Sequence, residues 1–142
     1  MTTAHTDYIE KALAEVPLFV HLNSKQRKEL KSLMTPIEVK AGYHLTEEGA
    51  IGREFGVIIE GEASVDVHGE KVATLKAGDF YGEVALLEEI GHHHHKRMAT
   101  VVATTDMVVG VLSVNEFRTL LADIPEIADS VKRAAADRAG TA

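Results

Sequence analysis

One short stretch of the chain combines residue types that bind phosphate. A Gly-Asp turn at Gly78 leads to Gly82, and the helix-forming residues that follow predict a short helix beginning near Gly82. The first turn of such a helix presents unpaired N–H groups and the positive end of its dipole, which attract an anion. Because Gly82 has no Cβ, a ligand can approach its backbone closely.

Two charged side chains beside this turn extend the prediction to a ligand with a hydroxyl as well as a phosphate. Glu83 suits a sugar hydroxyl, since a carboxylate accepts hydrogen bonds and repels phosphate. Arg97 offers a planar fork of donors that matches phosphate oxygens. Each residue also has a structural interpretation: Glu83 as an acid stabilised by the helix dipole, and Arg97 as a surface arginine paired with Glu88 or Glu89.

The stretch resembles the phosphate-binding cassette of cyclic-nucleotide-binding domains, as in the bacterial catabolite activator protein and the regulatory subunits of cyclic-AMP-dependent protein kinase. That pattern runs Gly-Asp, Gly-Glu, Ala-Leu and, after a short loop, Arg-x-Ala. The matching positions are Gly78, Asp79, Gly82, Glu83, Ala85, Leu86, Arg97 and Ala99. The resemblance implies that Glu83 holds the ribose 2′-hydroxyl, and that Arg97 and the amides around Val84 and Ala85 hold the cyclic phosphate.

The resemblance also implies where the rest of the nucleotide binds. By position, Val65 and Leu75 line the apolar side of the pocket, and the last helix caps the base through Ile127 or Val131. The full set of expected ligand-binding residues is Gly82, Glu83, Val84, Ala85, Arg97, Met98, Ala99, Val65 and Leu75. In the family a hydroxyl residue directly after the arginine favours the guanine nucleotide. Met98 cannot donate that bond, so cyclic AMP is the expected ligand in preference to cyclic GMP.

The composition restricts the function classes. At 142 residues the chain predicts a single domain over 1–142. The net charge of −7 argues against a nucleic-acid partner. No cysteine is present, which excludes disulfides, thiolate metal sites and a cysteine nucleophile. No apolar run is long enough to span a membrane and the start is not a signal peptide, so we expect a cytoplasmic protein without a membrane partner.

Three segments are expected to position the site: an N-terminal helical lead-in over 1–35, a β-roll with the cassette over 36–113, and C-terminal helices over 114–139. The lead-in predicts a helix over 7–15 capped by Asp7. A second helix, capped by Asn23 or Ser24, runs to Met34.

The middle segment has short β-prone runs broken by glycines, which predicts a jelly-roll-like β-roll, a double-stranded β-helix. The fold class is therefore mainly β with flanking helices. His68-Gly69 is typical of a tight hairpin turn. One departure from the family is Gly56, where an aromatic residue is common, and it leaves the local packing open. The expected strands lie at 37–39, 55–59, 63–67, 71–75, 100–103 and 107–112.

The C-terminal segment predicts two helices. Ser113 and Glu116 form a capping box that starts the first helix. Pro125 suits the first turn of the second.

The four histidines His92–His95 make the loop before Arg97 about four residues longer than the family norm, a change that loop entropy tolerates. The favoured interpretation is a solvated loop tip or an inserted purification tag. A metal site through His92 and His94 is the second, although adjacent histidines rarely complete a zinc shell. The third is a pH effect, in which protonated imidazoles raise the positive potential near the phosphate site.

Together these features predict a stand-alone cyclic-nucleotide sensor that is not an enzyme and that signals through movement of its C-terminal helices. Its output would be an effector protein or self-association, unless the chain is a fragment of a longer regulator. The alternative is a nucleotide-free interaction scaffold on the same fold. A metal-dependent enzyme on a cupin-like barrel is disfavoured, because such sites spread their ligands over separate strands.

Overall fold

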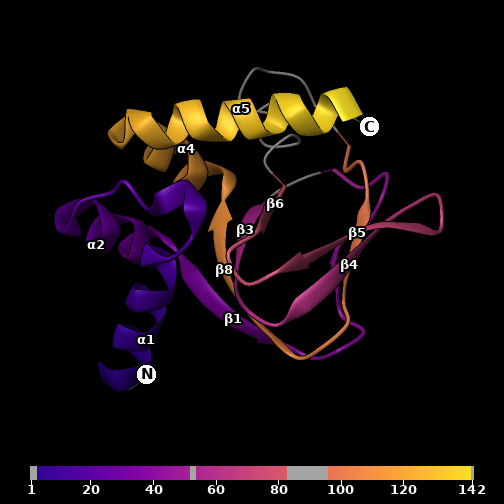
Figure 1. Ribbon diagram of the computed structural model, residues 1–142, viewed down its shortest axis with the longest axis horizontal. Coiled ribbons are helices and arrows are strands. Elements are labelled where there is room, and N and C mark those ends of the chain that lie inside the picture. Colours follow the sequence, from indigo (N-terminus) through magenta and orange to yellow (C-terminus); the bar gives the residue numbers. More distant parts are fainter. Residues whose placement is uncertain (1–2, 52–53, 83–95, 142) are drawn as a thin grey trace.

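The strands gather at one end of the molecule and the shorter helices at the other. The computed structural model describes residues 3–51, 54–82 and 96–141. Helices α1 (Thr3–Ala14), α2 (Ser24–Leu33) and α4 (Val114–Asp123) lie at the helical end, whereas α5 (Pro125–Thr141) runs from there across the strands (Figure 1). A short 3-10 helix, η1 (Pro17–Phe19), connects α1 and α2.

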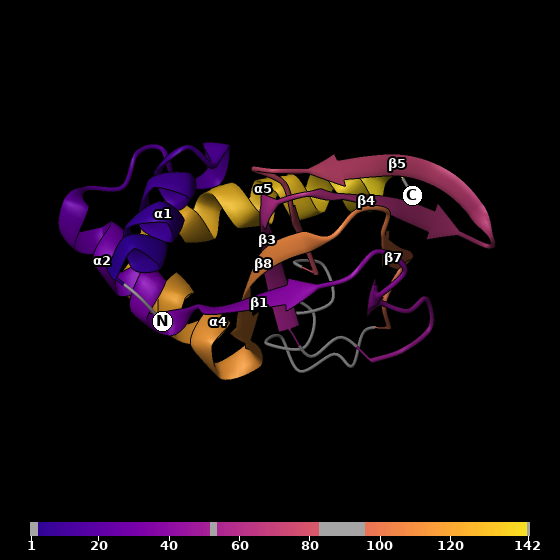
Figure 2. The same ribbon diagram turned by 90° about the horizontal axis from the view of Figure 1, so that it is seen from below.

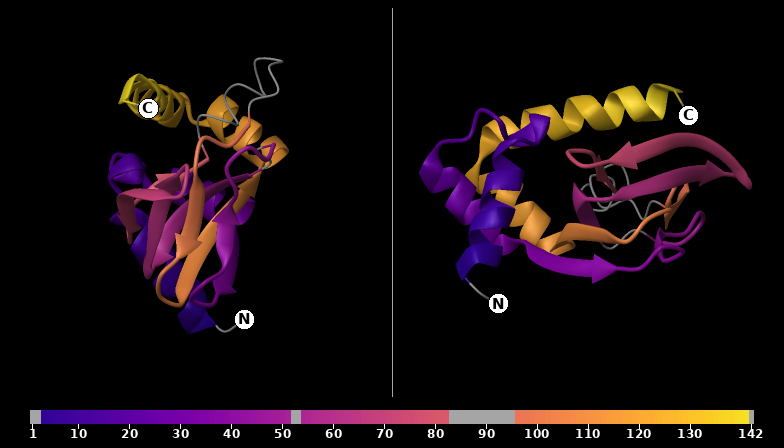
Figure 3. Two further views of the ribbon diagram at one scale, coloured as in Figure 1. Left: turned by 90° about the vertical axis from the view of Figure 1, so that its right-hand side faces the viewer. Right: turned by 60° about the horizontal axis from the view of Figure 1, so that its bottom comes forward.

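Two four-stranded antiparallel sheets form the β-roll. Their strand orders are β1-β8-β3-β6 and β2-β7-β4-β5. The strands curve around a common interior, with α5 along one side (Figure 3). This arrangement confirms the predicted fold class of a mainly β roll with flanking helices. The strands are β1 Thr35–Val39, β2 His44–Thr46, β3 Glu54–Glu60, β4 Glu62–Val67, β5 Glu70–Lys76, β6 Phe80–Tyr81, β7 Thr100–Ala103 and β8 Met107–Ser113.

The predicted hairpin turn at His68-Gly69 is confirmed. Val67 pairs with Glu70, so a two-residue loop joins β4 to β5. His68 and Gly69 both have positive φ, 53° and 83°. Two consecutive positive φ values match the twist of the flanking strands, and glycine adopts the second without strain. The hairpin projects at the far end of the roll (Figure 2).

The helix caps confirm two predictions and correct one. Asn23 caps α2 in a reciprocal capping box with Gln26. Ser113 and Glu116 form the expected box at the start of α4. The predicted cap at Asp7 is wrong, because α1 begins at Thr3 and Asp7 lies inside it. The residues before Asp7 include no proline or glycine that would break a helix, so the helix extends from Asp7 back to Thr3.

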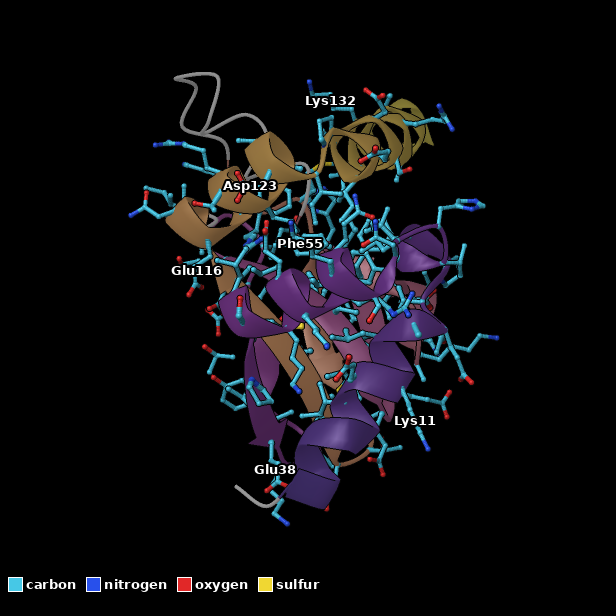
Figure 4. All side chains as sticks on the ribbon, turned by 90° about the vertical axis from the view of Figure 1, so that its left-hand side faces the viewer. Lys11, Glu38, Phe55, Glu116, Asp123 and Lys132 are labelled. Atoms are coloured by element: carbon cyan, nitrogen blue, oxygen red, sulfur yellow. The ribbon has the colours of Figure 1, made fainter. Side chains whose placement is uncertain are left out.

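Strand β3 separates two hydrophobic cores because successive side chains point to opposite faces. Phe55, Val57 and Ile59 pack into a core shared with the helices. Ile58 faces the roll interior, in a second core. The Phe55 ring lies 4.8 Å from that of Phe117 on α4. In Figure 4, Phe55 lies deep between β3 and the helices, whereas labelled charged residues such as Lys132 point outward.

The turn between β7 and β8 is fastened to the end of β1 by Asp106. Its Oδ1 accepts a hydrogen bond from the amide of Ala41 at 3.0 Å, and its Oδ2 lies 3.5 Å from Nζ of Lys40. The hydrogen bond from Ala41, followed by the charge of Lys40, lowers the pKa of Asp106 below its usual value of 3.8. The folded state therefore favours the ionised carboxylate.

We expect Asp106→Asn to lower the free energy of unfolding slightly at pH 7. Asparagine keeps an acceptor for the Ala41 amide but loses the charge. A lowered folded-state pKa stabilises the fold above the unfolded-state pKa, and this contribution disappears as the pH falls through the folded-state value. Urea denaturation at pH 7 and at acid pH checks this. If the variant and the wild type still differed in free energy of unfolding at pH 2, that difference would contradict the electrostatic explanation.

Candidate functional site

Gly82 and Arg97, which the sequence predicted to share a site, lie against each other. Gly82 follows β6 and has φ +90°. A Cβ placed on Gly82 would lie 2.6 Å from Nη1 of Arg97 and 2.5 Å from the carbonyl oxygen of Glu54. Only glycine fits this backbone conformation and this space. The guanidinium therefore lies directly against the backbone at the start of the cassette.

Arg97 is buried, with 8% of its surface exposed, so the alternative interpretation as a surface arginine is wrong. Its backbone amide donates to the carbonyl of Ala50 at 2.6 Å, and its carbonyl accepts from Gly49 at 3.0 Å. Its Nη2 donates to the Glu54 carbonyl at 2.8 Å. These hydrogen bonds fix the position of the Arg97 backbone and the orientation of its guanidinium group. A guanidinium held in a fixed plane is suited to bind the oxygens of an anion such as phosphate.

Two threonines fix the segment that carries Arg97. Thr46 Oγ1 donates to the carbonyl of Ala99 at 2.9 Å and accepts from the amide of Val101 at 3.1 Å. Thr100 Oγ1 accepts from the amide of Glu48 at 3.0 Å. Thr46 is buried and occupies an irregularity in the β2–β7 pairing. Sequence reasoning missed Thr46, because its role depends on a pairing between segments far apart in the chain.

The residues expected to line the apolar side of a pocket do face the roll interior. Leu75 belongs to the roll core, and Val65 packs against that core. Met98 and Ala99 are half-buried next to Arg97. Glu83, Val84 and Ala85 lie outside the described residues, as do the predicted helix after Gly82 and His92–His95 with the candidate metal ligands His92 and His94. Within the described part of the chain, no three potential metal-ligating side chains gather.

Ile127 and Val131, which were expected to cap a nucleotide base, lie in the helical core of this structure. Both side chains are fully buried, with exposed fractions of 1% and 0%. They pack into the helical core together with Phe19 of η1. In this arrangement the apolar stripe of α5 holds the helix to the protein.

The departure at Gly56 is explained by Tyr81. The two residues are direct partners in the β3–β6 pairing. A Cβ on Gly56 would lie 2.2 Å from the Cε1 and Cζ atoms of Tyr81 and 2.4 Å from its hydroxyl oxygen. The phenol ring therefore occupies the space above Gly56 that a side chain on β3 would need. Sequence reasoning noted the missing aromatic residue but not that the neighbouring strand supplies one.

The Tyr81 hydroxyl is an unusual polar group at this site. The residue is 3% exposed, and its hydroxyl has no hydrogen-bond partner among the described residues. Burial, with a further contribution from the Glu54 carboxylate, raises the pKa of Tyr81 far above its usual value. Arg97 acts in the opposite direction, to a smaller extent. The group is therefore a neutral hydrogen-bond donor next to the predicted phosphate site.

Comparisons with known proteins identify the family of this chain. The family model described as "Cyclic nucleotide-binding domain" matches residues 36–123, more than half of the chain. A cAMP-dependent protein kinase regulatory subunit from Yarrowia lipolytica is 40% identical over 114 residues, which cover 79% of this chain and 29% of that protein. The chain thus spans less than a third of that relative.

Two solved structures share the fold. The regulatory domain of Toxoplasma gondii PKA, crystallised with cAMP, aligns with a TM-score of 0.80 at 22% identity, over 95% of this chain and 51% of that chain. The regulatory subunit of a cAMP-independent protein kinase A from Trypanosoma brucei aligns with a TM-score of 0.80 at 23% identity, over 93% of this chain and 47% of that chain.

Among the described helices, none is both long enough and apolar enough to cross a bilayer. The family match covers the roll, except for the first residue of β1, and the helix α4 that follows it. The 40% identity to the Yarrowia lipolytica protein extends over most of the chain. The chain belongs to the cyclic nucleotide-binding domain family.

Proposed function

We propose that this domain binds cyclic AMP, in preference to cyclic GMP, as a regulatory module without catalytic activity. The observation that carries the proposal is the contact between Gly82 and Arg97. It places a buried guanidinium directly beside the backbone of a glycine. A cyclic phosphate is a compact anion that can approach both groups, and charge-assisted hydrogen bonds to it are strong.

The remaining contacts of the proposed site follow the family pattern. Glu83 would accept a hydrogen bond from the ribose 2′-hydroxyl, and the amides of Val84 and Ala85 would bind the phosphate. Val65 and Leu75 would pack against the apolar faces of the nucleotide, since both belong to the roll interior or its border. Met98 and Ala99 would complete the site beside Arg97.

The proposed output is a change in the position of α5 within a single domain spanning residues 1–142. Ile127 and Val131 hold α5 in the helical core, so any movement of α5 must break and remake that packing. A ligand can drive this change only through a difference in its affinity for the two arrangements. The receiver would be an effector protein or a second copy of the chain.

Thermal unfolding with cyclic AMP and with cyclic GMP tests the proposal. A ligand at a hundred times its Kd stabilises a protein by about 2.7 kcal/mol. For a domain of this size we expect Tm to rise by roughly 5–10 °C with cyclic AMP and by less with cyclic GMP. The linear nucleotide 5′-AMP is the matched control. No shift with either cyclic nucleotide at millimolar concentration would overturn the proposal.

Replacement of Met98 by threonine is expected to improve the binding of cyclic GMP. The threonine hydroxyl can hydrogen-bond the guanine base, and one net hydrogen bond corresponds to roughly a threefold to tenfold gain in affinity. Isothermal titration calorimetry measures both nucleotides. Met98→Val is the control, because valine has the shape of threonine without the hydroxyl. Equal gains in the two variants would mean that the loss of methionine, and not the hydroxyl, changes the preference.

The second candidate is an interaction scaffold of the same fold that binds no nucleotide. The Trypanosoma brucei relative favours it, because a protein described as cAMP-independent shares this fold. The Gly56–Tyr81 packing is a further departure from the common family pattern. A scaffold would show no Tm shift with either cyclic nucleotide.

A further inference from the structure

We propose that Tyr81 is an additional ligand-contacting residue, whose buried hydroxyl donates a hydrogen bond to an oxygen of the ribose–cyclic phosphate part of the nucleotide. The inference rests on the proposed function, because it needs a nucleotide in the roll. It goes further by assigning a contact that lies outside the cassette pattern.

The first support is the place of Tyr81 in the chain and in the fold. Tyr81 ends β6 and directly precedes Gly82, whose backbone lies against the guanidinium of Arg97. Its side chain belongs to the roll core, together with Leu75 and Val101. The ring therefore lies in the apolar interior of the roll, near enough to Arg97 to interact with it electrostatically.

The second support is the orientation of the ring. The atoms nearest to a Cβ on Gly56 are Cε1, Cζ and the hydroxyl oxygen, which are the far end of the phenol. The ring is thus laid across the interior face of β3. The hydroxyl therefore lies over Gly56, the residue after Phe55. Phe55 in turn follows Glu54, whose carbonyl accepts the hydrogen bond from Arg97.

The third support is that the hydroxyl lacks a partner. Only 3% of the surface of Tyr81 is exposed, and no described residue forms a hydrogen bond with its hydroxyl. Leaving a buried hydroxyl unsatisfied is unfavourable, so such groups usually have a functional or structural reason. Because burial keeps the phenol protonated, its O–H is available to donate a hydrogen bond to an acceptor.

The neighbours narrow the identity of that partner. Other side chains of the roll core to which Tyr81 belongs, such as Leu75, Val101 and Ala63, are apolar and have no acceptor. The Glu54 carboxylate acts on the hydroxyl electrostatically but forms no hydrogen bond with it. The ribose–cyclic phosphate group carries several acceptor oxygens, and Arg97 would hold it at the neighbouring position. An oxygen of this part of the ligand is therefore the best match in chemistry and in place.

The test compares Tyr81→Phe with the wild type by isothermal titration calorimetry with cyclic AMP and with cyclic GMP. Phenylalanine keeps the ring over Gly56 and removes only the hydroxyl. We expect the Kd of the variant to be about fivefold to tenfold higher, which corresponds to one net hydrogen bond. The factor should be the same for both nucleotides, because they share the ribose and the phosphate.

The Tm of the ligand-free variant separates a ligand contact from a structural role. Without ligand we expect Tyr81→Phe to have an unchanged or higher Tm, because an unsatisfied hydroxyl has been removed. Tyr43→Phe is the control, since Tyr43 is 53% exposed and its loss of a hydroxyl should change neither Kd nor Tm.

The outcomes separate this inference from the proposed function. Wild-type protein that binds neither nucleotide overturns both. Wild-type binding with an equal Kd for Tyr81→Phe overturns only the role of Tyr81. A lower Tm without ligand and an unchanged Kd would assign the hydroxyl to an internal water. A factor that differs between the two nucleotides would place the contact on the base and overturn the assignment to ribose or phosphate.

Discussion

Arg97→Ala is expected to weaken the binding of cyclic AMP by about a hundredfold to a few thousandfold. Removing one partner of a buried, charge-assisted pair costs about 3–5 kcal/mol, and each 1.4 kcal/mol is a factor of ten. The variant also loses the hydrogen bond from Nη2 to the Glu54 carbonyl. Isothermal titration calorimetry gives the affinity, and the Tm without ligand shows whether the fold is retained.

Two further variants make this test specific. Arg97→Lys keeps the charge but loses the planar fork, so it should recover only part of the affinity. Arg118→Ala removes an exposed arginine on α4 and should bind like the wild type. Binding by Arg97→Ala within a factor of three of the wild type would remove Arg97 from the site. An unfolded Arg97→Ala would leave Arg97→Lys as the deciding variant.

Local sequence signals predicted those elements whose stability is itself local. The capping box at Ser113 and the turn at His68-Gly69 each depend on residues within a few positions of one another, and both are confirmed. The long strands β3, β4 and β8 were predicted from their β-prone composition. Strands β2 and β6 were missed, because three and two residues are too few to show a period.

The candidate site was predictable only in part, for a related reason. The pairing of Gly82 with Arg97 could be inferred because both lie in one motif, and the structure places them in contact. The burial of Arg97 depends on carbonyls from Ala50 and Glu54, which the motif does not contain. Contacts of this kind arise from the sheet pairing and have no signature in the local sequence.

The apolar face of α5 shows a second limit of prediction from sequence. The spacing of Ile127 and Val131 predicted an apolar face correctly, but a face alone does not say what covers it. A ligand base and the helical core would both suit the same side chains. The core contains them here, with Phe19 as a neighbour. Only the tertiary arrangement could decide between the two.

The Gly56–Tyr81 pair gives the second large expected effect, this time on stability. We expect Gly56→Ala to lower the free energy of unfolding by about 3 kcal/mol, because its Cβ would overlap the buried Tyr81 ring. The ring atoms are only 2.2 Å from that position, so the ring or the strand must move. Urea denaturation at neutral pH measures the loss.

A double-mutant cycle identifies Tyr81 as the cause of this loss. Tyr81→Leu removes the far end of the ring, so Gly56→Ala should cost less than about 1 kcal/mol in that background, a coupling of roughly 2 kcal/mol. Gly110→Ala is the matched control, because its Cβ would meet Met34 in the other core, 2.1 Å from the sulfur. That loss should be equal in both backgrounds. If Gly56→Ala were equally harmful with leucine at position 81, the space above Gly56 would be limited by the strand itself and not by the tyrosine.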